Sequence, residues 1–212
     1  MENIVIVDCI RTGLAKSHRG TFNMTRSDDL AAHCIDALLA RNPQLDPAQV
    51  DDVILGCGRQ IGEQSGNVAR HAVALSQLPI TVPATTISRA CSSGLNSIAF
   101  AATQLNSGCA EIMLAGGVES ITGLSRGTPG EFAENPRLMS EKPDMYMAMG
   151  NTAEVVARRY QVTREAQDAY ALSSQQRFAA AEAAGYIKDE IAPMTVQWEK
   201  GVDKESKATM VV

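Results

Sequence analysis

The stretch TTISRACSSGLNSIAFAATQLNSGCAEIMLAGG, residues 85–117, predicts a strand, a helix and a second strand in immediate succession. Residues 85–88 are a short β-branched run. The predicted helix extends from about Cys91 to Leu105, with apolar residues at helical spacing, and ends at the Asn106-Ser107-Gly108 stop signal. Residues 112–115 are again short and apolar, so the stretch is typical of a parallel α/β fold.

The same alternation extends towards the N-terminus. Residues 3–7 (NIVIV) are apolar without alternation, as in a strand buried on both faces, and residues 52–55 predict another strand. One helix is predicted between them, capped by Ser27 and ending before Asn42-Pro43, and a second over residues 66–78. The sequence therefore predicts an α/β fold with a βαβαβαβ core.

The pattern of residue types changes after Ala115. Glycines and prolines interrupt the chain until a helical pattern returns near Asn151, and Thr163 is expected to cap a later helix that ends at Gly185. We expect a boundary near Ser120. It would separate an α/β core at residues 1–119 from a loop and helical subdomain at residues 120–212.

Charge and composition exclude several classes of protein. The 212 residues carry a net charge of −5 without a basic run, which argues against a nucleic-acid partner. The chain opens without a secretory signal, and polar side chains run through its longest uncharged stretch, so we expect a cytoplasmic protein with no membrane span. An odd number of cysteines without a CxxC pair favours neither a disulfide framework nor a metal site: Cys9, Cys34, Cys57, Cys91 and Cys109.

The glycines at residues 56–62 follow a predicted strand, as a dinucleotide-binding loop would. Their spacing is GxGxxxG rather than GxGxxG, and no acidic residue ends the next strand. We interpret this segment as a structural turn and expect no permanently bound cofactor.

Cys91 is the candidate nucleophile. It lies where the strand at residues 85–88 turns into the next helix, which places its thiol and its backbone N–H at a helix N-terminus. Such a position stabilises a thiolate, and it can also stabilise an oxyanion on a bound carbonyl. From the residues alone, this nucleophilic role and a role as a small core side chain are equally supported.

Longer strings extend the comparison to a known family. SRACSSGLNSIAFAATQLNSG (88–108), followed by AEIMLAGGVESIT (110–122), resembles the thiolase signature around the acyl-accepting cysteine. Three further segments agree with it: residues 4–22, residues 66–75, and residues 149–193, which open with MGNTAE. The chain thus resembles the N-terminal half of a thiolase over nearly its whole length.

The resemblance implies a function. Cys91 would carry an acyl group as a thioester, and Met149 would lie at a family position near that thioester, although Ala148 stands where family members often have His. The full-length protein would be an acyl-CoA acyltransferase that cleaves 3-ketoacyl-CoA or condenses acetyl-CoA, with CoA as substrate. The family also implies a homodimer or homotetramer, with the segment at residues 62–78, which includes Asn67 and Arg70, near the interface.

The resemblance also implies that this chain is incomplete. A thiolase is about twice as long, and its second half supplies an Asn in an NEAFA-like motif, a His in a GHP-like motif and a Cys in a CxG motif. None of these motifs occurs here, and a lone half would expose Leu95, Ile98 and Ala102. The other four cysteines are expected to be inert small hydrophobes, and surface or packing roles are expected for His18, His33 and His71.

Two alternatives stay open at this point. A ketoacyl-synthase-like condensing enzyme also presents an ACSSG-type cysteine, although MGNTAE is not expected there. The other alternative is a non-catalytic half-chain with the thiolase fold.

Overall fold

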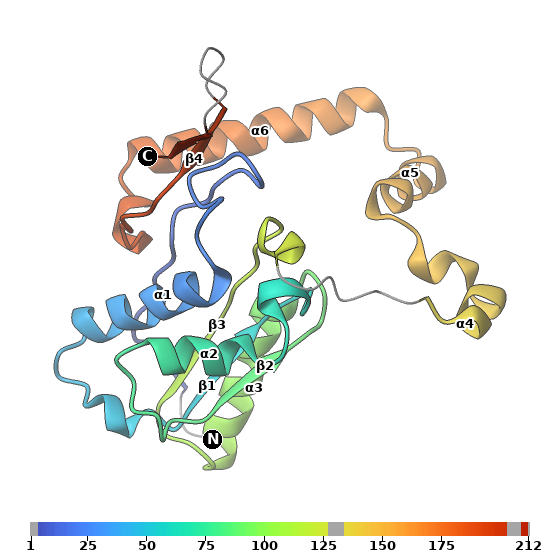
Figure 1. Cartoon of the computed structure of the whole chain (residues 1–212). Coiled ribbons are helices and arrows are strands. Elements are labelled where there is room, and N and C mark those ends of the chain that lie inside the picture. Colours follow the sequence, from blue (N-terminus) through green and yellow to red (C-terminus); the bar gives the residue numbers. More distant parts are fainter. Residues whose placement is uncertain (1–3, 127–133, 203–208, 212) are drawn as a thin grey trace. The chain divides into compact units, whose positions relative to one another are not determined.

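The computed structural model describes residues 4–126, 134–202 and 209–211 (Figure 1). Its contacts divide the chain into two compact units, Met1–Gly130 with Glu190–Val212, and Glu131–Asp189. The boundary near Ser120, between a core at residues 1–119 and a subdomain at residues 120–212, stays a prediction.

A parallel sheet with the strand order β2-β1-β3 forms the centre of the first unit. Its strands are β1 (Asp52–Gly56), β2 (Ala84–Ile87) and β3 (Met113–Gly117). Val53 pairs with Ala84 on one side and with Leu114 on the other. The three predicted strands that surround Cys91 in the sequence are therefore confirmed.

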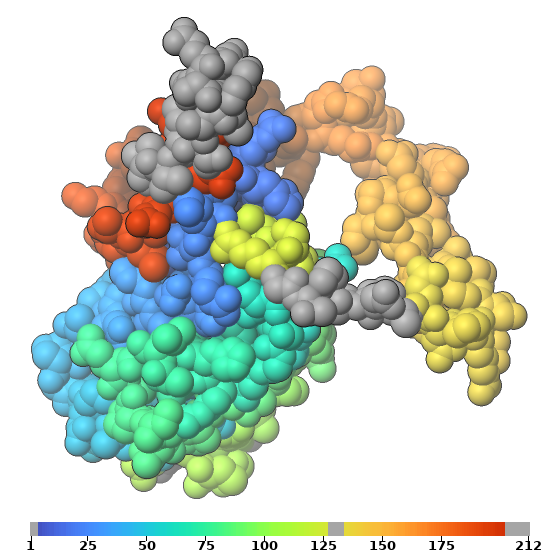
Figure 2. Space-filling view, in the orientation of Figure 1, coloured from blue at the N-terminus to red at the C-terminus, as the bar shows by residue number. Residues whose placement is uncertain are grey.

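Helices cover both faces of this sheet (Figure 1). α2 (Val68–Leu75) contacts β2 and β1 and lies beside α1 (Ser27–Arg41), whereas α3 (Ser93–Ser107) contacts β1 and β3. The surfaces of α1, in blue, and α2, in green, adjoin one another in Figure 2. A short 3-10 helix, η1 (Pro47–Gln49), leads into β1.

The apolar core lies between the sheet and the α1–α2 layer. Side chains alternate along a strand, so Val53 and Leu55 point to the same face of β1. They are buried in one cluster with α1 and α2 residues that include Ile35, Leu39 and Val73. This cluster is the main hydrophobic contribution to the stability of the unit.

On the other face, small residues let α3 approach the strands closely. A Cβ at Gly56 would overlap the backbone of Ser93, and one at Gly117 would lie 3.3 Å from the Cα of Gly94. Ser97 is fully buried, with its Oγ 2.6 Å from the carbonyl oxygen of Gly116. The helix therefore turns a face of small and polar residues to the sheet.

The opposite face of α3 is apolar and uncovered. Leu95 is 73% exposed and Ile98 is 41% exposed, whereas Ala102 is half-buried. For the two large side chains, exposure is the outcome predicted for an isolated half.

The strand predicted at residues 3–7 is wrong. Ile4 to Val7 form no strand, and Val7 is 81% exposed; Asn3 lies outside the described residues. A continuous apolar run becomes a buried strand only when a neighbouring backbone pairs with it and other layers cover both its faces. Local sequence contains no information on whether those layers are present.

Two helix boundaries also differ from expectation. Arg26 rather than Ser27 is the N-cap of α1, and Ser27 is the first helical residue, buried beneath Glu63 Oε1, which accepts its N–H at 3.1 Å. A carboxylate from another loop thus replaces the local cap. α2 is shorter than the predicted 66–78 and ends at Leu75, which is exposed because Val68, Ala69, Ala72 and Val73 supply its buried face.

The second unit is helical. It contains α4 (Pro136–Glu141), the 3-10 helix η4 (Pro143–Tyr146), α5 (Met149–Arg159) and α6 (Arg164–Ala183). The predicted cap of α6 is confirmed, because Thr163 Oγ1 accepts the N–H of Ala166 at 3.2 Å. Gly185 has a positive φ of 82° just beyond the helix, as a C-terminal stop requires.

The remaining segment begins with the 3-10 helix η5 (Lys188–Glu190) and ends in an antiparallel pair, β4 (Glu199–Val202) and β5 (Thr209–Val211). Within the first unit, Asn23 joins this segment to the N-terminal part of the chain, since its amide both donates to and accepts from the backbone of Glu199. Within the described ranges, no helix has the length and apolar character needed to cross a bilayer.

We expect Gly56→Ala to lower the free energy of unfolding by about 2 kcal/mol or more, because the methyl group would overlap main-chain atoms of α3. Gly94→Ala is the matched control. Its Cβ would meet open space inside a helix, so stability should stay equal or rise by less than about 1 kcal/mol. Urea unfolding followed by circular dichroism measures both changes. Equal effects of the two substitutions would contradict the packing described for α3.

Candidate active site

The loops that follow the three parallel strands meet at one edge of the sheet. Cys57 N donates to Ile87 O at 2.9 Å, and Val118 N donates to Gly56 O at 3.0 Å. Ser88 Oγ donates to Gly58 O at 3.3 Å. The carboxyl edge of a parallel sheet is the usual place for a site in α/β proteins, and the candidate nucleophile lies here.

Cys91 is exposed on a strained turn between β2 and α3. It precedes the N-cap Ser92 and follows Ala90, whose φ of +47° is unfavourable for a residue with a Cβ. Ser93 holds the turn, because its Oγ lies 2.6 Å from Ala90 O and accepts from Arg89 N at 2.8 Å. An exposed residue on a strained strand-to-helix turn has the geometry of a nucleophile elbow, and it fills no core.

The other four cysteines lie in different surroundings. Cys57 is fully buried; burial, together with the charge of Glu119, raises the pKa of its thiol to about 11. Burial also raises the pKa of the half-buried Cys34. Cys9 and Cys109 are exposed: Cys9 extends the uncovered N-terminal run, and Cys109 follows the end of α3. That these thiols are inert stays a prediction.

A buried amide and a carboxylate join the loops around the elbow, and sequence reasoning missed both. Gln64, in the 3-10 helix η2 (Gly62–Gln64), is 0% exposed. Its Nε2 donates to Glu119 Oε1 at 2.7 Å and to Arg59 O at 2.8 Å, while its Oε1 accepts from Ser120 N. Glu119 Oε2 accepts from Gly58 N at 2.7 Å. Polar residues in loops have no periodicity, so no pattern in the sequence indicates these contacts.

The neighbouring residue Glu63 anchors the same short helix on its other side. Its carboxylate is almost completely buried and accepts from Ser27 N at the start of α1. It also lies 3.5 Å from Arg126 Nη1 and 3.8 Å from Arg26 Nη1. Gly123, in η3 (Gly123–Ser125), makes room for it, since any side chain there would overlap the Glu63 side chain.

Met149 lies in the second unit, as the first residue of α5, and is exposed. Its role near an acyl group stays a prediction. The same unit contains an open cavity of about 460 Å³, lined by Met147, Asn151, Glu154, Val155 and Arg158.

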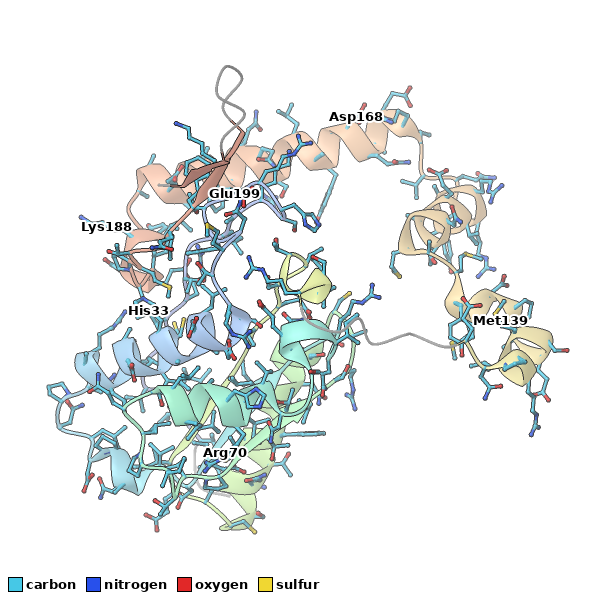
Figure 3. All side chains as sticks on the ribbon, in the orientation of Figure 1. His33, Arg70, Met139, Asp168, Lys188 and Glu199 are labelled. Atoms are coloured by element: carbon cyan, nitrogen blue, oxygen red, sulfur yellow. The ribbon has the colours of Figure 1, made fainter. Side chains whose placement is uncertain are left out.

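The three histidines are spread over the first unit. His18, in a loop, and His71, on α2, are exposed, and His33 is half-buried on α1, where Figure 3 labels it. Among the residues that the structure describes, no group of three or more His, Cys, Asp or Glu side chains is arranged to hold a metal ion.

The fold and the turn together define an α/β protein that presents a cysteine at a strand-to-helix elbow. The family model described as "Thiolase, N-terminal domain" matches residues 4–211. The chain therefore belongs to the thiolase family, of which it represents the N-terminal half.

Individual relatives agree with this assignment. The chain is 41% identical to 3-ketoacyl-CoA thiolase of Serratia proteamaculans, over 95% of this chain and 52% of the relative. It is 43% identical to beta-ketoadipyl-CoA thiolase of Acinetobacter baylyi, over 95% of this chain and 54% of the relative. The chain thus spans about half the length of the curated relatives it matches.

A solved structure confirms the predicted thiolase-like fold. The crystal structure of the Bacillus anthracis acetyl-CoA acetyltransferase is 32% identical to this chain and superposes with a TM-score of 0.77. The match covers 100% of this chain and 54% of that one.

We expect Cys91 to be the thiol that reacts fastest with limiting iodoacetamide at neutral pH, measured by mapping the adducts by mass. Cys109 is a matched internal comparison, because both thiols are exposed but lie at opposite ends of α3. The helix dipole stabilises a thiolate at the N-terminus and disfavours it at the C-terminus. Cys57 should stay unlabelled. The preference for Cys91 should disappear in the urea-unfolded chain, and preferential labelling of Cys34 or Cys57 in the folded chain would contradict the prediction.

Proposed function

We propose that this chain supplies the acyl-accepting cysteine of a thiolase that cleaves 3-ketoacyl-CoA or, in reverse, condenses two molecules of acetyl-CoA. The exposure of Cys91 on a strained turn carries the proposal. The family match and the names of the relatives support the same reaction class.

In this reaction the Cys91 thiolate attacks the keto carbon of the substrate. The bond between the α-carbon and that carbon breaks, and the carbanion takes a proton and leaves as acetyl-CoA. The thiolate of a second CoA then attacks the acyl thioester, and Cys91 leaves as a thiolate. The positive end of the α3 dipole stabilises negative charge that develops on the sulfur and on the carbonyl oxygen.

CoA is a substrate here, and we propose no permanently bound cofactor. The acid and base that the two steps need have no counterpart in the motifs of this chain. The uncovered face of Leu95 and Ile98 favours a related proposal, that α3 packs against further protein in the complete enzyme. By itself, the chain would then be a non-catalytic half with the thiolase fold.

We expect the 212-residue chain alone to show no measurable turnover. Acid–base catalysis and oxyanion stabilisation each commonly contribute about a hundredfold or more in rate. Among the residues that the structure describes, we assign such a role to Cys91 and the start of α3 only. The measurement is the loss of acetoacetyl-CoA in the presence of CoA, for the chain, its Cys91→Ala variant and the full-length gene product. At most, the chain should trap one acetyl group on Cys91, visible as a mass shift that Cys91→Ala abolishes.

Multiple turnovers by the chain that disappear in Cys91→Ala would contradict this expectation. They would show that His18, His33 or His71 serves as the general base.

We also propose a homo-oligomer that pairs through the segment at residues 62–78; a cytoplasmic location stays a prediction from the sequence. Two large apolar side chains are exposed near this segment, Leu75 at the end of α2 and Ile80. The side chains of Asn67 and Arg70 face inwards: Asn67 Nδ2 donates to Ala84 O, and Arg70, labelled in Figure 3, donates to Val82 O and Ile80 O. They shape the surface rather than contribute free donors to it.

We expect Leu75→Glu to shift the chain from dimer to monomer in light scattering after size exclusion, because a charge buried in an apolar contact is costly. Leu172→Glu is the control, since Leu172 is comparably exposed but lies on α6. A dimer that survives Leu75→Glu and is lost in Leu172→Glu would contradict the proposed surface.

A further inference from the structure

We propose that Gln64 and Glu119 form a positioning bridge that holds the turn carrying Cys91 in its reactive conformation. The inference rests on the proposed role of Cys91 as the nucleophile. The bridge is defined by the hydrogen bonds from Gly58 N to Glu119 and from Gln64 Nε2 to Glu119.

The first step of the argument is the contact between Glu119 and the elbow. Gly58 lies between them: a Cβ on Gly58 would be 2.9 Å from Glu119 Oε2 and 3.2 Å from Ala90 O. The carboxylate, the loop after β1 and the residue before Cys91 are therefore packed together without a gap. Ala90 has a left-handed φ, and such a strained residue persists only where its surroundings fix it.

The second step is that Gln64 fixes the orientation of the Glu119 carboxylate. Both hydrogens of its amide nitrogen are used, one on Glu119 and one on Arg59 O, and its oxygen accepts from Ser120 N. A flipped amide would place its NH₂ group against the N–H of Ser120. Glu63, next to it in η2, attaches the same helix to α1 through Ser27 N. The bridge is thus anchored in the framework of the unit.

The third step is that residue 119 must be a carboxylate for this geometry. Both of its oxygens accept hydrogen bonds, one from a backbone N–H and one from an amide NH₂. A glutamine there would keep one acceptor and turn a donor towards another donor, which leaves one hydrogen bond unmade. Glu119 lies at the rim and is exposed, outside the apolar cluster, so its loss should affect the elbow more than global stability.

The test is an exchange of the two groups. Each single substitution breaks the hydrogen bond between the two side chains. Glu119→Gln places two amide donors against each other, and Gln64→Glu places two carboxylates against each other. In the double variant the new amide at 119 accepts from Gly58 N and donates to the new carboxylate at 64, which still accepts from Ser120 N. The bond between the two side chains is thus re-formed, and only the donor to Arg59 O is lost. Glu111→Gln, on another exposed carboxylate, is the control for loss of charge.

The readout is the rate of Cys91 alkylation by iodoacetamide in the 212-residue chain, divided by the rate at Cys109. We expect each single substitution to lower this ratio by about fivefold or more, since a small displacement of a reactive group costs much of its advantage. The double substitution should raise the ratio above that of either single variant, as coupled residues do in a double-mutant cycle, but not fully to that of the unsubstituted chain, because Arg59 O lacks its amide donor. Glu111→Gln should leave the ratio unchanged.

The outcomes separate this proposal from the proposed function. If Cys109 reacts faster than Cys91 in the unsubstituted chain, the nucleophile role fails. If Cys91 is fastest but the single substitutions leave the ratio unchanged, or the double substitution is no better than they are, the bridge is overturned. A joint rise in labelling of Cys91 and the half-buried Cys34 would show general loosening of the fold and would also overturn it.

Discussion

The close approach of α3 to the sheet fixes the geometry on which the rest of the first unit depends. Gly56 and Gly117 lack the side chains that would hold the helix off, and buried Ser93 and Ser97 fill the remaining space. Ser97 reaches the strand through Gly116 O, so the contact is polar as well as tight. A helix this near to β1 has to start immediately beyond the sheet edge, and the chain reaches it through the strained turn at Ala90.

Polar groups, rather than apolar packing, connect the loops at that edge. Glu63 and Gln64 are consecutive, both buried, and point their hydrogen bonds in different directions, one towards α1 and the other towards the loop after β3. Buried groups of this kind are costly unless every donor and acceptor finds a partner. The hydrogen bonds of Glu63 and Gln64 are directional and made. These two side chains therefore restrict the loop to fewer conformations than apolar side chains would.

Much of the fold could be predicted from the sequence, because periodic patterns report local structure well. The strands around Cys91, the helix after it and the Thr163 cap all follow from short-range signals. The N-terminal run at residues 3–7 shows the limit: its apolar character specifies what would be favourable in a buried layer, but not whether that layer exists. Ser27 fails for a similar reason, since a carboxylate 36 residues away serves its backbone N–H.

The residues of the candidate site differ in the same way: some have a local sequence signal, and others depend on contacts that are distant in sequence. Cys91 could be found because a turn between a strand and a helix leaves a local signature, and the thiolase resemblance agreed with it. Gln64 and Glu119 could not, since their partners are backbone groups on loops distant in sequence. Met149 was singled out by resemblance alone, and its position in the second unit neither supports nor opposes that role.

The thiol of Cys91 lies just before the start of α3, and the uncovered side chains of Leu95 and Ile98 lie along the flank of this helix. A helix of this length is stiff. Protein that packs against the flank of α3 therefore also constrains the orientation of its first turn. Under the proposed function, packing on α3 and acylation of Cys91 would be linked. A partner layer that favours one arrangement of the thiol would be bound more tightly once an acyl group favours the same arrangement, and by the same factor. The strength of packing on Leu95 and Ile98 would in this way depend on whether Cys91 carries an acyl group.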